Sequence, residues 1–155
     1  MHLYLLRHAD ADTVAADDDE RILSEKGIAQ AQRVARFCEA HEIKPALIFS
    51  SHIRRALQTA QVVAEHLDSE LRAVRWLACG AEPANVIAQV NEYGNHPSIM
   101  LVGHAPDFSL LAAHLIGGNS GDNVHIRKAT LAYFTVHDYK AGGARLEFLL
   151  PVKLM

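Results

Sequence analysis

The sequence predicts an α/β protein: a three-layer sandwich with a mostly parallel central sheet, helices on both faces and a C-terminal antiparallel hairpin. Two observations lead to this fold class. Short apolar runs, which are typical of buried strands, alternate with segments whose apolar residues recur at helical spacing. The last two runs, residues 131–136 and 145–150, instead follow each other across a turn at Gly142-Gly143. That pattern indicates a hairpin at one side of the sheet.

Three strands are predicted at short continuous apolar runs, residues 3–6, 46–49 and 99–102, and a further strand is predicted at residues 71–76, where apolar residues are interrupted by two arginines. A helix follows each of these strands, and the first, third and fourth helices have a recognisable signal at one end. Ser24 can cap the first helix, and Pro45 stops it. Its apolar face is predicted to carry Ile28, Ala31, Val34, Ala35 and Cys38. The second helix has an apolar face over residues 53–67, the third begins near Pro83, and the fourth carries Phe108 and ends at Gly117-Gly118.

Length and composition set the limits of the functional prediction. The 155 residues suit one domain, residues 1–155, large enough for a core without disulfides. The net charge of -3 gives no general attraction to nucleic acid or to anionic lipid. No stretch has the length of a signal peptide core or a membrane span, so a cytoplasmic location is expected. The two cysteines, Cys38 and Cys79, are interpreted as free thiols.

The chemistry is expected at one edge of the sheet, because ligands of open α/β sheets bind beyond the carboxyl ends of the strands. The first strand ends in Arg7-His8 and the fourth in Gly103-His104. The second ends in Ser50-Ser51 and leads into a helix with Arg54 and Arg55 in its first turn. Each of these short motifs alone is a weak signal, since strand ends often carry polar residues. Their shared placement predicts a cationic pocket.

Such a pocket suits a phosphoryl group. Arginine offers a planar fork of donors that matches phosphate oxygens, and helix N-termini favour anions. A neutral histidine can attack phosphorus and form a phosphohistidine that water then hydrolyses. The arginines would stabilise the transition-state charge. A histidine metal site is disfavoured, because no histidine pair has ligand spacing beside carboxylates and the arginines would repel a cation. No cofactor is expected.

At these residues the sequence resembles the histidine phosphatase superfamily, whose fold is phosphoglycerate-mutase-like. Leu6-Arg7-His8-Ala9 resembles its first motif, the run from Ser50 to Ala60 its second, and Val102-Gly103-His104 the late Gly-His motif. The resemblance implies that His8 is the phosphorylated nucleophile, that Arg7 and Arg55 bind phosphate, and that His104 is the second pocket histidine. Arg54 aligns with a variable, solvent-facing position. His52 stands where the family often has proline, and we interpret this as loop variation.

One departure from the family pattern points to a branch. Larger members carry a carboxylate, the proposed general acid, after the third strand, whereas this chain has Leu77-Ala78-Cys79-Gly80 there. The short chain without that acid resembles the SixA-type phosphohistidine phosphatases. An alcohol leaving group needs protonation as it departs, whereas a phosphohistidine has a labile P–N bond. Glu82, Asp10 and Asp107 remain alternative acids, for which solvated-loop or helix-start roles are favoured.

The resulting prediction is a phosphatase that removes phosphoryl groups from phosphohistidine on a signalling or carrier protein, such as a histidine phosphotransfer domain. The alternatives are a phosphatase for a small phosphomonoester or phosphoanhydride, and a non-catalytic phosphoprotein-binding module. Two further features are weaker signals. The acidic stretch Asp17 to Glu20 is interpreted as a solubilising loop, with guidance of a basic partner as the other hypothesis. Thr130 is a candidate for an extra phosphate contact, although it is more simply a strand residue.

Overall fold

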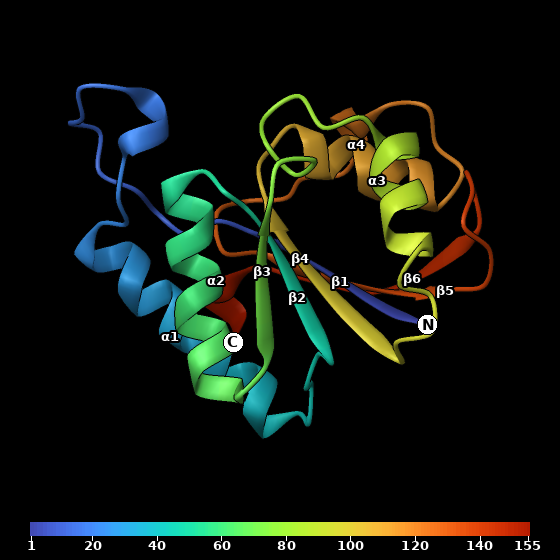
Figure 1. Ribbon diagram of the computed structural model, residues 1–155, viewed down its shortest axis with the longest axis horizontal. Helices are drawn as coiled ribbons and strands as arrows, with labels where there is room; N and C mark the ends of the chain where they lie inside the picture. Colours follow the sequence, from blue (N-terminus) through green and yellow to red (C-terminus); the bar gives the residue numbers. More distant parts are fainter.

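The computed structural model describes residues 1–155, and its centre is one six-stranded sheet with the order β3-β2-β4-β1-β5-β6 (Figure 1). The strands are β1 (His2–Arg7), β2 (Leu47–Ser51), β3 (Glu70–Val74), β4 (Ser98–Gly103), β5 (Leu131–Val136) and β6 (Ala144–Leu150). The first four in this order run parallel, whereas β5 is antiparallel to β1 and β6 is antiparallel to β5. The prediction of a mostly parallel sheet with a C-terminal hairpin at its side is confirmed.

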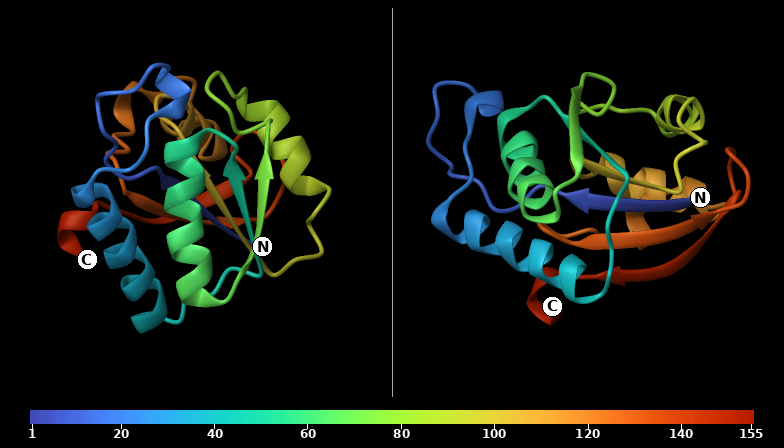
Figure 2. Two further views of the ribbon diagram at one scale, coloured as in Figure 1. Left: turned by 60° about the vertical axis from the view of Figure 1, so that its left-hand side comes forward. Right: turned by 60° about the horizontal axis from the view of Figure 1, so that its bottom comes forward.

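Four α-helices cover the sheet: α1 (Glu25–Ala40), α2 (Arg54–Leu67), α3 (Pro83–Asn91) and α4 (Asp107–Leu115). Helices α1 and α2 lie on one face, and α3 and α4 lie on the other (Figures 1 and 2). Three short 3-10 helices complete the chain: η1 (Asp18–Glu20), η2 (Gly121–Asn123) and η3 (Val152–Leu154). The predicted three-layer sandwich is therefore confirmed. None of the helices is both long enough and apolar enough to cross a bilayer.

The core explains why the central strands read as continuous apolar runs. Along β1, Leu3 and Leu5 pack into the core under α3 and α4, whereas Tyr4 and Leu6 pack into the core under α1 and α2. Successive side chains of a strand point to opposite faces, so a strand covered on both faces must be apolar at every position. Both cysteines are free, as predicted; Cys38 is buried in the core under α1 and α2, and Cys79 is exposed.

The helix ends follow the expected local chemistry. The Ser24 hydroxyl accepts a hydrogen bond from the Gly27 N–H and caps α1, and Pro83 is the first residue of α3. One prediction about a helix face is wrong: Ile28 is 43% exposed. The buried stripe of α1 begins at Gly27 instead, and one helical step turns the next side chain by about 100° toward solvent.

Candidate functional site

The strand register brings the predicted residues to one edge of the sheet. Arg7 is the register partner of Gly103, and the His8 N–H donates to the Gly103 carbonyl at 2.9 Å. His104 follows directly, so the imidazole rings of His8 and His104 lie 5.3 Å apart between centroids. Arg55 arrives from the first turn of α2 and is 4% exposed. Of the ten histidines in the chain, only His8 and His104 are buried.

His8 is held as a neutral imidazole with a defined tautomer. Its Nδ1 lies 2.8 Å from the carbonyl oxygen of Ala9. A carbonyl only accepts, so we assign the ring proton to Nδ1, and the lone pair to Nε2. Burial, together with the positive charge of the neighbouring arginines, lowers the pKa of His8 to about 3. An uncharged nitrogen with a free lone pair is the form of histidine that can act as a nucleophile.

His104 is neutral for the same reason and is oriented by a serine. Burial first, and then the charges of Arg55 and Arg7, lower the pKa of His104 to about 4. Its Nε2 lies 2.9 Å from the Ser51 hydroxyl, which already accepts the Ile53 N–H. We assign the hydroxyl proton to the contact with Nε2, which places the ring proton on Nδ1. That Nδ1 is buried and has no hydrogen-bond partner in the protein.

The two arginines also carry donors without partners. Arg7 donates from one terminal nitrogen to the Ile126 carbonyl at 3.0 Å, and Arg55 donates to the Asp18 carbonyl at 2.9 Å. The Nε atoms of both arginines are buried and unpartnered. Burial and the charge of Arg55 lower the pKa of Arg7. Each unpaired buried donor costs about 1–3 kcal/mol, so an anion with several acceptor oxygens fits this group of atoms.

Two polar side chains, those of Thr59 and Gln30, hold the segment that follows His8, although sequence patterns alone assign them no individual role. The Ala9 N–H donates to the Thr59 hydroxyl at 3.0 Å, and that hydroxyl donates to the Arg55 carbonyl one helical turn earlier at 2.8 Å. The Asp10 N–H donates to the Gln30 side chain at 2.9 Å. The first motif is thereby tied to α1 and α2. The available signal was a threonine on the apolar face of α2, four residues after Arg55.

None of the three alternative acids forms a hydrogen bond or an ion pair with the side chains of the two histidines and two arginines. Asp10 accepts hydrogen bonds from Lys128 at 2.8 Å and from Ser24 at 2.7 Å, which hold the pKa of its carboxyl below the usual range. Asp107 accepts the Gly80 N–H at 2.8 Å. Glu82 is exposed at the start of α3. Their placement matches the helix-start and loop roles favoured by the sequence.

The remaining candidates divide into one buried residue and two exposed ones. Thr130 is fully buried, its carbonyl accepts the Arg7 N–H at 3.2 Å, and its hydroxyl has no partner. It therefore lies next to the first motif. Arg54 and His52 are exposed, and Arg54 forms an ion pair with Glu20 at 3.2 Å. No group of three or more His, Cys, Asp or Glu side chains is arranged to hold a metal ion.

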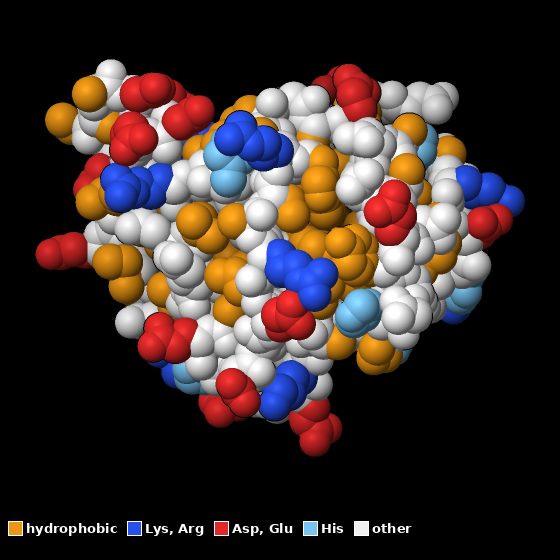
Figure 3. All heavy atoms as spheres, in the orientation of Figure 1, with side chains coloured by type: hydrophobic (Ala, Val, Ile, Leu, Met, Phe, Trp, Pro, Cys, Tyr) orange, Lys and Arg blue, Asp and Glu red, His pale blue; other side chains and the backbone are white.

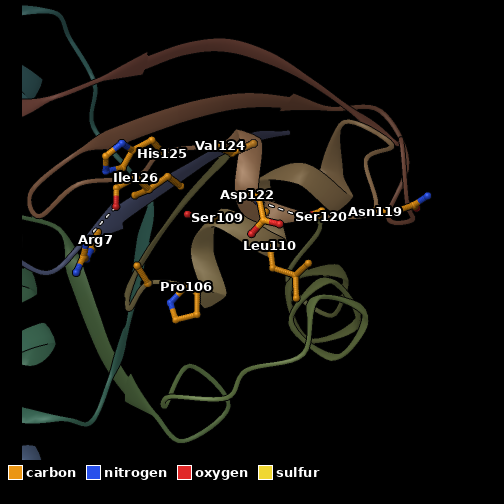
Figure 4. Close-up of a pocket in the computed structure, with 12 residues that line it drawn as sticks. Arg7, Pro106, Ser109, Leu110, Asn119, Ser120, Asp122, Val124, His125 and Ile126 are labelled. Atoms are coloured by element: carbon orange, nitrogen blue, oxygen red, sulfur yellow. Dashed lines mark hydrogen bonds between the residues drawn. The ribbon is translucent and has the colours of Figure 1, made fainter.

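A groove of about 670 Å³ runs from Arg7 along the outside of α4 (Figure 4). In Figure 4, Arg7 and Pro106 lie at one end of it and Asn119 at the other. Its lining is largely polar, with backbone and side chains from the start of α4, from η2 and from the segment that leads to Ile126. The groove therefore offers space for whatever group is attached to an anion at Arg7.

Comparison with known proteins agrees with this geometry. A family model described as histidine phosphatase superfamily (branch 1) matches residues 3–78. The structure of the protein histidine phosphatase SixA complexed with tungstate superposes with a TM-score of 0.89 at 21% identity, covering 99% of this chain and 98% of that one. A candidate phosphohistidine phosphatase SixA from Agrobacterium tumefaciens gives a TM-score of 0.81 at 25% identity, covering 97% of both chains.

Other similar proteins carry other names. The alpha-ribazole phosphatase from Shigella flexneri has a TM-score of 0.81 at 19% identity, covering 98% of this chain and 97% of that one. An uncharacterized protein of Picosynechococcus sp. (strain ATCC 27264 / PCC 7002 / PR-6) is 28% identical over 152 residues, which is 95% of this chain and 89% of that protein. Over residues 3–78 the chain matches the histidine phosphatase superfamily. Its fold is that of the SixA-type members.

Proposed function

We propose that this chain is a phosphatase that works through a covalent phosphohistidine on His8. The observation that carries the proposal is the group of buried, unpartnered donors on Arg7, Arg55 and His104 around a neutral imidazole. A binding module needs donors for an anion, but it does not need a nucleophile whose lone pair is kept free. The protein with a TM-score of 0.89 was complexed with tungstate, which is also an oxyanion.

The reaction divides into two displacements at phosphorus. In the first, the Nε2 lone pair of His8 forms a bond to phosphorus while the bond to the leaving group breaks. In the second, water attacks phosphorus, the P–N bond breaks, its electron pair returns to Nε2, and inorganic phosphate departs. Arg7, Arg55 and the Nδ1–H of His104 donate to the phosphoryl oxygens, whose negative charge they stabilise in the transition state.

For the substrate class we propose phosphohistidine on a signalling or carrier protein in the cytoplasm, such as a histidine phosphotransfer domain. The support is the engagement of two of the three alternative acids. Asp10 is paired with Lys128, and Asp107 holds the Gly80 backbone. A leaving imidazole departs from a labile P–N bond without a dedicated carboxylic acid, whereas an alcohol needs a proton donor. The arrangement therefore favours a phosphoamide over a phosphate ester.

The groove supports a second candidate, a phosphatase for a small phosphomonoester or phosphoanhydride. Its volume of about 670 Å³ lies within the range of small-molecule sites. Solved structures with the same fold include proteins named for ester substrates, among them the Shigella flexneri protein. An anhydride in particular needs no strong acid for departure. This candidate shares the His8 step and differs only in the leaving group.

The test compares initial rates of phosphate release from a phosphohistidine-containing phosphotransfer domain and from p-nitrophenyl phosphate, on one preparation. We expect fast release from the first and little from the second. The reverse pattern would select the small-molecule candidate, and Glu82 would then be the first carboxylate to mutate. Rapid quenching into alkali, in which phosphohistidine is stable, measures the covalent intermediate directly.

The nucleophile is tested with His8→Ala, which should lose turnover and the trapped phosphoryl label while keeping the circular dichroism spectrum of the fold. His137→Ala is the matched control, because His137 is exposed and forms no side-chain hydrogen bond. Full activity of His8→Ala would refute the covalent mechanism. Binding of phosphate by the wild type without turnover of either substrate would instead identify a phosphoprotein-binding module.

A further inference from the structure

The acidic stretch beside the site is not a freely solvated loop. It protrudes over the start of α2 (Figures 1 and 2), and acidic side chains gather on it (Figure 3). Within it, Glu20 is paired with Arg54, and Asp18 is paired with two arginines. One of these is Arg55, whose side chain is only 5% exposed, whereas that of Asp18 is 65% exposed. An exposed carboxylate therefore reaches a buried phosphate-binding candidate.

The contact is made through two atoms of Asp18. The carbonyl oxygen accepts from one terminal nitrogen of Arg55 at 2.9 Å, and the carboxylate Oδ2 lies 3.3 Å from the other. The second carboxylate oxygen, Oδ1, forms an ion pair with Arg21 at 2.9 Å, although without the alignment of a hydrogen bond. Asp18 thus bridges two guanidinium groups, and its backbone and side chain contact Arg55 independently.

We propose that the Asp18 carboxylate is the resident counter-ion of Arg55 and that an incoming phosphoryl group must displace it, an inference that rests on the proposed function. Because Asp18 contacts both Arg21 and Arg55, replacing its carboxylate by a phosphoryl group at Arg55 costs little free energy. When Oδ2 leaves Arg55, the carboxylate keeps its partner Arg21 and turns further into solvent, so no charge is left buried and unpaired. The Asp18 carbonyl keeps Arg55 in place, and the second terminal nitrogen of Arg55, which also lies 3.8 Å from the Cys79 Sγ, turns its other N–H from the carboxylate to a phosphoryl oxygen.

The exchange bears on product release. After hydrolysis, the site holds inorganic phosphate between two arginines, which is a strongly favourable arrangement for an anion. A carboxylate that competes for Arg55 weakens the binding of that product. Asp18 therefore sets phosphate affinity, and its position selects ligands that carry enough negative charge to replace a carboxylate. It is a specificity-determining residue and takes no part in the bond-making steps.

The test is a calorimetric titration of inorganic phosphate into the wild type, Asp18→Asn and Asp19→Asn. Asp18→Asn keeps the carbonyl contact and the side-chain shape but removes the competing charge, so phosphate should bind roughly two- to tenfold tighter. Asp19→Asn makes the same charge change in the same segment, where Asp19 has no ion-pair partner. Its phosphate affinity should stay within about twofold of wild type.

The sign of the change separates competition from support. Unchanged or weaker phosphate binding by Asp18→Asn would overturn the inference, since a residue that merely positions Arg55 would weaken binding when altered. Equal tightening in Asp19→Asn would also overturn it, because the effect would then be a general one of charge. Phosphohistidine turnover by the same wild-type preparation distinguishes failure of the two proposals. If the wild type turns over substrate but Asp18→Asn does not bind phosphate more tightly, the counter-ion role alone is rejected. If the wild type neither turns over substrate nor binds phosphate, both proposals are rejected.

Discussion

Replacing Thr59 by valine should loosen the segment that follows His8, the proposed nucleophile, at a cost in stability that follows from one hydrogen bond. Valine has nearly the same shape as threonine and keeps the packing of α2. The Thr59 hydroxyl is the side-chain acceptor for the Ala9 N–H at 3.0 Å, and both residues are fully buried. The Arg55 carbonyl that the hydroxyl also contacts lies within a continuing helix, so it keeps its backbone partner. One buried N–H is therefore left unsatisfied.

An unsatisfied buried donor costs about 1–3 kcal/mol, so the free energy of unfolding of Thr59→Val should fall by that amount. For a chain of this length the midpoint of thermal unfolding should drop by roughly 2–12 °C. Urea denaturation measures the free energy, and Thr59→Ser, which keeps the hydroxyl, is the control. A loss below about 0.5 kcal/mol in the valine variant would refute the reasoning, because surface-like changes are of that size. Phosphatase turnover should fall in parallel, since Ala9 is adjacent to His8.

Two further outcomes are expected. Gly27→Ala should destabilise the protein by roughly 1–3 kcal/mol or more in urea denaturation, because a Cβ there would lie 1.9 Å from the Asp10 carbonyl oxygen; Gly118→Ala, with its closest atom at 3.2 Å, should cost less. Acidification should also destabilise the native state: the pKa values of His8 and His104 are depressed to about 3 and about 4, so below pH ~6.5 the unfolded chain binds protons that the native state does not. From pH ~6.5 down to about 4, each histidine should lower the free energy of unfolding by up to about 1.4 kcal/mol per pH unit. An equally steep fall with pH in the His8→Asn/His104→Asn double variant, measured by urea denaturation, would contradict this.

The sequence predicts the site where it depends on sheet topology and fails where it depends on loop packing. Arg7, His8 and His104 follow strands, and neighbouring parallel strands must end at the same edge, so their convergence needs no structural information. Arg55 follows from its place in the first turn of α2. The contact between Asp18 and Arg55 spans 37 residues and depends on the path of an irregular segment. No periodicity encodes that path, and the acidic run therefore reads as a solubilising loop.

Two other features could not be derived from residue patterns for physical reasons. Ile28 is apolar and falls on the extrapolated stripe of α1, but burial depends on where the helix axis lies relative to the sheet, which sequence spacing leaves open. The tautomers of His8 and His104 depend on which ring nitrogen faces an acceptor. The Ala9 carbonyl places the ring proton of the first histidine on Nδ1, and the tautomer of the second is assigned from its contact with the Ser51 hydroxyl. Both contacts depend on the fold and are not encoded in residue spacing.

The electrostatics of the site meet two opposing requirements of the proposed reaction. Holding a phosphoryl dianion requires cations, whereas attacking phosphorus requires a histidine that is not one. Arg7 and Arg55 meet the first requirement, and their charges add to burial in lowering the pKa of both histidines, which meets the second. The charge proposed to bind the substrate thus also helps to keep Nε2 of His8 unprotonated. The Asp18 carboxylate acts against this effect by raising the pKa of His104, but it lies on the solvent side of Arg55, and no buried carboxylate lies among these residues. A carboxylate introduced among these residues would raise the pKa of both histidines and so reduce the fraction of His8 that carries a free Nε2 lone pair. The proposed substrate, whose leaving group needs no such acid, avoids this loss.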